Sequence, residues 1–112
     1  MSLVQEFNKN RSRLNEQVLA TNDKVIKRIF SIDSFAFSEG KLDAKSKELI
    51  GLTCSLVLRC DDCVKYHLGK AKDVGLSKEE ITEAMSISTL IGGTIVIPHL
   101  RRAVEYLDEL FA

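Results

Sequence analysis

Residues 43–68 read DAKSKELIGLTCSLVLRCDDCVKYHL, and this stretch decides the fold because a long apolar segment runs directly into a pair of cysteines. Asp43 is a favourable N-cap residue, since its carboxylate can accept hydrogen bonds from the free amides of a first helical turn. We therefore expect a helix from Asp43 to about Arg59. Apolar residues surround its axis nearly completely, as is typical of a central helix packed on several sides: Leu49, Ile50, Leu52, Cys54, Leu56, Val57 and Leu58.

Helical periodicity continues on both sides of this segment. Apolar residues recur at spacings of three, four or seven, with charged residues between them, as on amphipathic helices. The pattern predicts an all-α, single-domain helical bundle of about six helices, near residues 3–19, 22–37, 43–59, 60–74, 77–92 and 99–111. No internal repeat, linker or low-complexity tract interrupts it, so we expect one domain over residues 1–112.

Residues that start and stop helices mark several of these boundaries. Asn22 or Thr21 can cap the second helix, and Gly75 can supply the left-handed residue that ends the fourth. Residues 77–80 form a capping box, in which a serine hydroxyl and a glutamate carboxylate each accept from the other's backbone amide. Pro98 is expected to end the fifth helix or to begin the last one.

Composition excludes several classes of function. Sixteen basic side chains balance sixteen acidic ones with no separate basic run, so a nucleic-acid partner is not expected. No segment is apolar enough to span a bilayer and the first residues do not resemble a signal peptide, so we expect no membrane partner and a cytoplasmic location. Three cysteines are too few for a secreted disulfide scaffold, which favours a catalytic or metal-binding role for the close pair.

The pair Cys60 and Cys63 has the spacing of a redox motif. A redox thiol needs a lowered pKa and a second thiol that resolves the oxidised product. If Cys60 begins the fourth helix, the amides of the first turn and the positive end of the helix dipole favour a thiolate there. At about 100° per residue, His67 shares a narrow arc with both cysteines and can exchange a proton with Cys63. The carboxylates of Asp61 and Asp62 oppose a thiolate.

A zinc site is the alternative interpretation of the pair. Cys60, Cys63 and His67 would give three ligands, and Cys54 or His99 would have to supply the fourth. A closed structural site normally has a second close ligand pair, which the sequence lacks, so we expect neither a metal nor another cofactor. For Cys54 we favour packing in the core, and for His99 a partly exposed position at a helix start with a secondary role in the site left open.

Three segments in order resemble the carboxymuconolactone decarboxylase family, specifically its alkylhydroperoxidase (AhpD)-like branch. They are GKLDAKSKELIGL at residues 40–52, CDDCVKYHLGKA at residues 60–71 and EEITEA at residues 79–84. The resemblance covers roughly residues 40–106, and the first two helices are family-like only in being helical. It implies an all-helical subunit that assembles into a homo-oligomer, a trimer or a hexamer.

The resemblance also implies roles for four residues. The two motif cysteines of that branch form a redox disulfide in which the second thiol reacts first, which maps to Cys63 with Cys60 as its partner. A downstream histidine and an upstream glutamate relay the proton, which maps to His67 and Glu48. On local grounds alone, Glu48 is a first-turn carboxylate favoured by the helix dipole. A plain hairpin at residue 60 would leave Glu48 about 7 Å beyond His67, so a steep helix crossing or a bridging water is expected.

The predicted function is therefore thiol-dependent reduction of hydroperoxides, with a hydroperoxide substrate and a protein or small-molecule thiol or dithiol as reductant. Asp62 stands where some alkylhydroperoxidases carry a second histidine, which counts against efficient peroxide reduction. Three alternatives stay open: a thiol-disulfide reductase without peroxidase activity, a carboxymuconolactone-type decarboxylase, and a non-catalytic zinc-stabilised helical module. The decarboxylase branch generally lacks the cysteine pair, whose presence here argues against decarboxylation.

Overall fold

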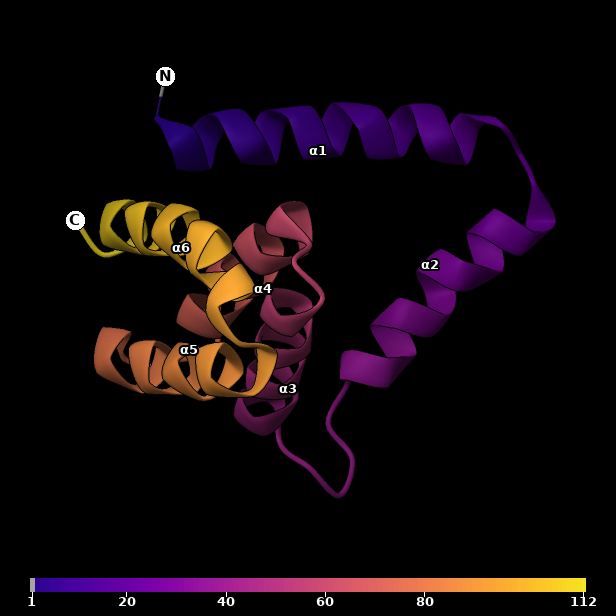
Figure 1. The fold of residues 1–112 in the computed structure, drawn as a ribbon. Coiled ribbons are helices and arrows are strands. Elements are labelled where there is room, and N and C mark those ends of the chain that lie inside the picture. The colour runs from indigo at the N-terminus through magenta and orange to yellow at the C-terminus, as the bar shows by residue number, and fades with distance from the viewer. Residues whose placement is uncertain (1) are drawn as a thin grey trace.

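A computed structural model describes residues 2–112 of the chain (Figure 1). Six α-helices and one short 3₁₀ helix make up this part, and no strand occurs within it. The all-α prediction is therefore confirmed. The helices are α1 (Leu3–Ala20), α2 (Lys24–Phe37), α3 (Ala44–Val57), α4 (Asp61–Asp73), α5 (Lys78–Gly92), η1 (Thr94–Val96) and α6 (Ile97–Leu110).

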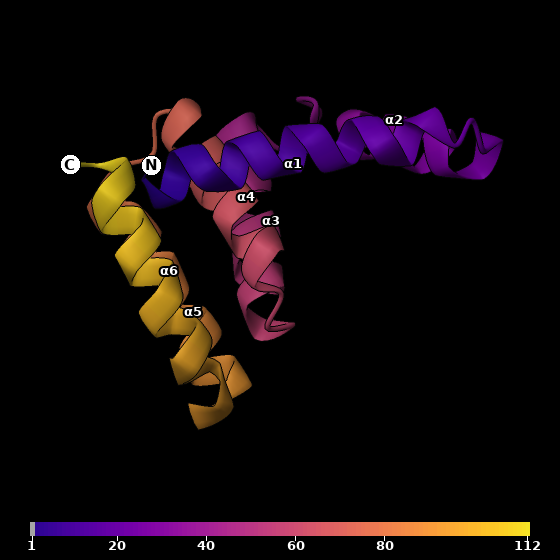
Figure 2. The same ribbon diagram turned by 90° about the horizontal axis from the view of Figure 1, so that it is seen from above.

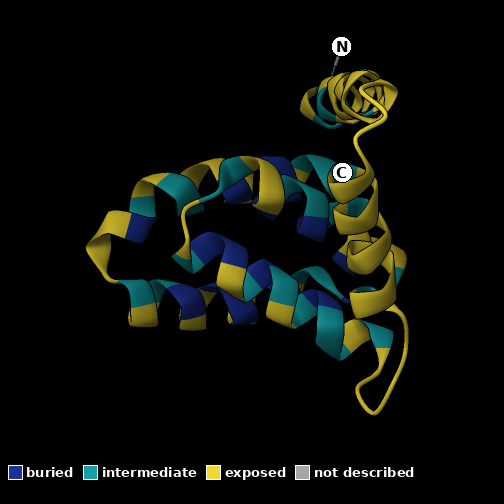
Figure 3. Ribbon diagram, turned by 90° about the vertical axis from the view of Figure 1, so that its right-hand side faces the viewer, coloured by how far each residue is buried: buried dark blue, intermediate teal, exposed yellow. Residues whose placement is uncertain are grey.

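The hydrophobic core lies among α3, α4, α5 and α6. Helix α3 packs against both α4 and α5, and α4 packs against α6. Figure 3 shows the buried residues on the faces that these helices turn toward one another. The core consists of Leu52, Leu56, Val64, Leu68, Ala71, Leu76, Ile81, Met85, Val96, Ala103, Tyr106 and Leu107.

Local signals place most helix ends as predicted. The Asp43 carboxylate accepts from the Ser46 amide, and Ser77 with Glu80 forms the capping box. Gly75 has a φ of 92° after α4, a left-handed conformation that glycine adopts without a Cβ clash. Pro98 lies in the first turn of the last helix, which begins at residue 97 rather than 99.

The cap of the second helix was predicted wrongly. Asp23, not Asn22 or Thr21, caps α2, because its carboxylate accepts from the amides of Val25 and Ile26. Asn22 instead has a φ of 58° and forms the bend that separates α1 from α2.

Helices α1 and α2 form an arm, residues 3–37, that extends from the four-helix core (Figures 1 and 2). Neither helix contains a fully buried residue. The start of α1 is fixed to α6, because the Leu3 amide donates to the Glu109 carboxylate and the ring of Phe7 meets Tyr106 edge to face at 5.9 Å. The end of α2 is held by Lys47, whose ammonium donates to two carbonyls there.

The apolar residues of α2 fall on two stripes. Ile26, Phe30 and Phe37 are half-buried against the chain, whereas a second stripe of Val25, Ile29 and Ile32 is about 60% exposed at each position. At about 100° per residue the two stripes lie on different sides of the helix. The second stripe is therefore an apolar surface that this single chain leaves uncovered.

Helix α3 is less enclosed than its composition predicts. It buries Leu52 and Leu56, but Ile50 is 50% exposed and Leu58, the C-cap residue that follows the helix, is 75% exposed. Cys54 is also exposed, so the prediction that it packs in the core is wrong. Two residues correspond to about 200° of rotation, which turns Cys54 away from the face that Leu52 buries.

None of the helices within residues 2–112 is long and apolar enough to cross a membrane.

Candidate active site

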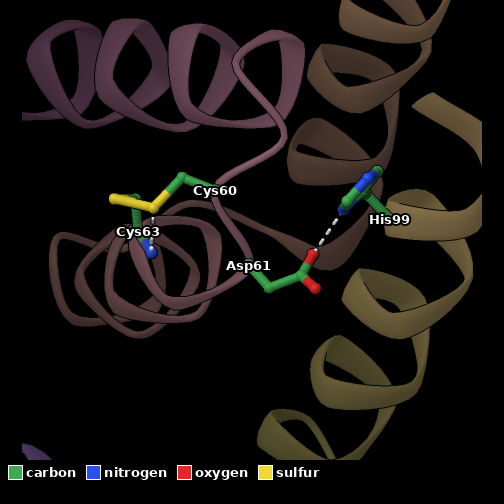
Figure 4. The surroundings of a disulfide bond; sticks show 4 residues. All are labelled: Cys60, Asp61, Cys63 and His99. Carbon is green, nitrogen blue, oxygen red and sulfur yellow. Dashed lines mark hydrogen bonds and ion pairs between the residues drawn. A yellow bond between two sulfur atoms is a disulfide. The ribbon is translucent and has the colours of Figure 1, made fainter. Parts of the chain in front are cut away.

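Cys60 and Cys63 form a disulfide at the start of α4 (Figure 4). Their Cα atoms are 5.3 Å apart, a separation that suits a disulfide without movement of the backbone. Cys60 is the N-cap residue, and its sulfur accepts a hydrogen bond from the Cys63 amide at 3.3 Å. Arg59, with a φ of 61°, is the left-handed residue that turns the chain from α3 into this cap. The predicted position at a helix N-terminus is confirmed.

The two sulfurs differ in access. Cys63 is exposed, whereas Cys60 is only partly exposed. In a reduced pair, the amide at the helix start would stabilise negative charge on Cys60, while Cys63 would be the thiol that an incoming molecule meets first.

His67 and Glu48 form a buried hydrogen-bonded pair between α4 and α3. The imidazole Nδ1 and the carboxylate Oε1 are 2.9 Å apart, and their side chains are 11% and 7% exposed. Because a carboxylate only accepts, the proton lies on Nδ1, which leaves Nε2 as the nitrogen available for chemistry. The contact is direct, so the bridging water considered from the sequence is not needed.

The register of α3 and α4 departs from that of a plain hairpin. His67 faces Gly51 rather than residue 53: a Cβ built on Gly51 would come within 2.7 Å of the imidazole ring. The helices are shifted by about one half-turn from a plain hairpin, and the glycine lets the ring lie against the α3 backbone. This shift and the length of the Glu48 side chain close the 7 Å gap.

Aromatic rings complete the surroundings of His67. The Phe37 ring lies 5.1 Å from the imidazole and the Tyr66 ring 5.2 Å from it, measured between centroids. The Arg11 guanidinium stacks over the Tyr66 ring at 4.0 Å from its centroid. The histidine is thus held by an anion on one nitrogen and by apolar surfaces around its ring.

A cleft of about 910 Å³ opens beside these residues. The α4 side contributes Cys63, Tyr66 and His67, and the arm contributes both apolar and charged side chains, Arg11 and Phe30 among them. The more exposed cysteine and the paired histidine therefore line the same space, into which a small substrate could enter.

On the far side of the first turn of α4, Asp61 contacts α6. Its carboxylate lies 2.8 Å from His99 Nδ1 (Figure 4). The Arg102 Nε atom lies 2.9 Å from the other carboxylate oxygen. Burial of the carboxyl would raise the pKa of Asp61, but the hydrogen bonds from His99 and Arg102 outweigh it and the pKa lies below its usual range. His99 is partly exposed in the first turn of α6, as predicted.

The candidate zinc ligands are not gathered together. Within residues 2–112 no three His, Cys, Asp or Glu side chains are placed to hold a metal ion. Cys54 is exposed on α3, and His99 is engaged by Asp61.

Three residues around the site escaped the sequence analysis. An isolated glycine inside an apolar helix signals a close approach, so Gly51 could have been found on that ground. Phe37 and Arg102 lie 30 and 35 residues from His67 in the chain and carry no comparable local signal, because only the folded arrangement brings their helices together.

Comparisons with known proteins agree on the fold and the family. The model of the carboxymuconolactone decarboxylase family matches residues 23–106, which includes α2 and so extends beyond the segments that carried the resemblance. A Thermotoga maritima protein of known crystal structure is 53% identical, with 95% of this chain and 93% of that chain covered and a TM-score of 0.92. A second structure of the same protein describes it as a carboxymuconolactone decarboxylase family protein with a suggested involvement in antioxidative response.

Two other similar proteins share less of their sequence with this chain. A Legionella pneumophila protein of the same family is 20% identical, has a TM-score of 0.86 with 96% of each chain covered, and shares the fold. A Cupriavidus necator protein of uncharacterized function is 32% identical over 69% of this chain and 68% of its own length.

Proposed function

This chain belongs to the carboxymuconolactone decarboxylase family, and on that premise we propose that it is a thiol-dependent oxidoreductase of the alkylhydroperoxidase type, reducing hydroperoxides through Cys60 and Cys63. The observation that carries the proposal is the buried Glu48–His67 pair, which lies beside a cleft that Cys63 also lines. The suggested antioxidative involvement of the Thermotoga maritima relative supports it.

The proposed reaction begins at Cys63. His67 Nε2 accepts the thiol proton, and the Glu48 carboxylate stabilises the imidazolium that results. The thiolate attacks the terminal oxygen of the hydroperoxide, the O–O bond breaks, and the alkoxide leaves as an alcohol after taking the proton from His67. Cys63 is then a sulfenic acid, the first step of thiol oxidation.

Cys60 completes the oxidative half of the cycle. Its thiolate attacks the Cys63 sulfur, hydroxide leaves as water, and the disulfide seen in the structure forms. The amide hydrogen bond at the Cys60 sulfur favours the thiolate needed for this step. A thiol or dithiol reductant supplies two electrons and two protons to restore the pair. Because the cytoplasm maintains such reductants, we propose a cytoplasmic location.

Disulfide exchange without peroxidase activity is the second candidate. The observation that favours it is Asp62, which stands where some alkylhydroperoxidases carry a second histidine and so supplies no second imidazole for the peroxide step. The same two cysteines would then reduce a disulfide of a protein or small molecule. Lactone decarboxylation is the third candidate, and this activity would survive the loss of both motif cysteines.

We also propose that the chain works as a homo-oligomer, a trimer or a hexamer, whose subunits cover the exposed stripe of α2. The chain exposes 7402 Å², and a compact 12.5 kDa monomer would expose about 6,200 Å². The surplus is of the order that one partner contributes to a stable interface. Exposed apolar residues on the arm, such as Ile29, Ile32 and Phe35, are the surface that a second copy would bury.

Substitution of each cysteine in turn tests the proposed reaction. Peroxide consumption with a dithiol reductant should vanish for Cys63→Ser. Cys60→Ser, reduced beforehand and then freed of reductant, should consume one equivalent of peroxide and leave a trappable sulfenic acid. Cys54→Ser is the matched control, because that thiol is exposed but outside the motif, and its activity should equal the original. Peroxidase activity that persists in Cys63→Ser overturns the mechanism.

A parallel assay separates the candidates. Reduction of a small aromatic disulfide without consumption of hydroperoxide would favour the exchange reaction, and lactone decarboxylation by a Cys60→Ser/Cys63→Ser variant would favour the third candidate.

A further inference from the structure

Of the two residues between the cysteines, Asp61 is the one whose side chain is fixed by contacts with another helix. It lies in the first turn of α4, next to the N-cap Cys60, and its side chain points away from the sulfurs toward α6 (Figure 4). His99 and Arg102, one turn apart on α6, contact its two carboxylate oxygens separately, at 2.8 Å and 2.9 Å. Each oxygen therefore has its own cationic or polar partner.

The proton arrangement around Asp61 follows from the groups involved. A carboxylate only accepts, so His99 Nδ1 carries the proton that it donates to Oδ1. Arg102 Nη2 also approaches Nδ1, at 3.1 Å. Because an arginine nitrogen only donates, that approach is a contact rather than a second hydrogen bond. Arg102 thus binds through Nε to Asp61, and its charge lies over the Asp61–His99 pair.

The neighbouring aspartate shows what this arrangement changes. Asp62 lies in the same turn and is exposed, and its carboxylate makes no hydrogen bond or ion pair with any residue from 2 to 112. A free carboxylate beside the cysteines disfavours a thiolate, and a first-turn carboxylate also competes for the amides that would stabilise one. Of the two acidic residues in the motif, only Asp61 is turned away and neutralised.

We propose that His99 and Arg102 are positioning residues of the redox pair: by holding the Asp61 carboxylate on α6, they keep its charge from the sulfurs and favour the reduced form of Cys60 and Cys63. The inference rests on the proposed redox function, since it assumes that the disulfide opens and closes reversibly. It links the last helix of the chain to a reaction on the opposite side of α4. Neither residue touches the reacting atoms.

Removing the charge of Arg102 and removing the charge of Asp61 should shift the thiol–disulfide equilibrium in opposite directions. Arg102→Gln removes the cation and frees the Asp61 carboxylate, so the thiolate becomes less stable and the pair shifts toward the disulfide. Asp61→Asn removes the anion and leaves the positive charge in place, so the pair shifts toward the dithiol. A merely structural role for the contact would shift both variants in the same direction.

The test is the thiol–disulfide equilibrium of the whole protein in glutathione redox buffers at pH 7, read by mass analysis after thiol trapping. We expect Arg102→Gln to raise the ratio of disulfide to dithiol by about two- to fivefold, the range for a partly exposed ion pair, and Asp61→Asn to lower it. His99→Gln should act in the direction of Arg102→Gln.

Arg101→Gln is the matched control, because it removes the same charge from an exposed neighbour that makes no hydrogen bond or ion pair to residues 2–112 through its side chain. Equal ratios for Arg102→Gln and Arg101→Gln, or shifts of the same sign for Arg102→Gln and Asp61→Asn, overturn the inference alone. A disulfide that no glutathione ratio reduces in the unsubstituted protein overturns the proposed function as well.

Discussion

His67 donates from Nδ1 to Glu48 Oε1 across the α3–α4 interface, and both side chains are buried next to the cleft. Burying a carboxylate with an imidazole does not by itself stabilise the fold, because the cost of removing the polar groups from water offsets the gain from their contact. A pair in this position is better explained by chemistry than by stability. His67 lines the cleft that Cys63 also lines.

Replacement of Glu48 by glutamine tests that explanation. The amide keeps the shape and a hydrogen-bond acceptor for Nδ1–H but loses the charge that stabilises an imidazolium. We expect the peroxide-dependent rate of Glu48→Gln to fall about 10- to 100-fold at pH 7, measured by stopped-flow oxidation of the reduced protein. Glu83→Gln, an exposed glutamate on α5, is the control and should retain the full rate. A full rate in Glu48→Gln would leave His67 without its proposed relay.

Two glycines offer a steric test of the same site. A Cβ at Gly51 would lie 2.7–2.9 Å from three atoms of the His67 ring, whereas a Cβ at Gly69 meets nothing within 4 Å. Alanine favours a helix interior over glycine by about 1 kcal/mol. We expect Gly69→Ala to raise the free energy of unfolding by up to about 1 kcal/mol with no change in peroxide turnover, and Gly51→Ala to lose turnover because the imidazole must move.

Urea denaturation and peroxide assays on both variants give the comparison. If Gly51→Ala turns over like Gly69→Ala, the position of the His67 ring against α3 does not matter for catalysis.

Local chemistry explains which parts of this structure could be predicted from the sequence. Asp43 and the box at residues 77–80 are caps that act within one turn, so their neighbours in the sequence are their neighbours in space. Cys60 at the start of α4 was predictable for the same reason. The pairing of Glu48 with His67 came only from the family resemblance, because spacing along the chain does not determine the register between two helices.

Exposure was harder to predict than secondary structure. Cys54 belongs to an apolar helix, but whether its face is covered depends on which helices pack there and on partner chains. The Asp61–Arg102 contact joins residues 41 apart, and no periodicity of either segment marks it. Such long-range contacts depend on how helices are arranged, which composition and spacing do not specify.

Tyr106 predicts how stability depends on alkaline pH. Burial, with a smaller contribution from the Glu109 charge, raises the pKa of Tyr106 above its usual value of 10.0. The unfolded chain therefore loses the phenol proton at a lower pH than the folded chain does, so this contribution to stability is intact below pH 10 and is lost as pH rises through the folded pKa.

Tyr106→Phe removes that titration and keeps the edge-to-face contact with Phe7. We expect urea midpoints of the two proteins to converge or reverse in favour of the variant as pH rises from 9 to 11. A constant difference in urea midpoint across that range would show that the pKa of Tyr106 is the same in the folded and unfolded chain.

If subunits pack on the exposed stripe of α2, one charged residue placed in the stripe should dissociate the oligomer. Ile32 is 62% exposed in the single chain, so in a monomer Ile32→Asp should change the free energy of unfolding by only about 0.5 kcal/mol. If a second copy covers the stripe, the same substitution buries an unpaired carboxylate at the interface and should dissociate the oligomer. Ser34→Asp adds the same charge about 200° around the helix and should leave the assembly intact. Sedimentation velocity of the three proteins at matched concentration decides the matter, and a species of unchanged mass for Ile32→Asp would mean that the stripe stays in solvent.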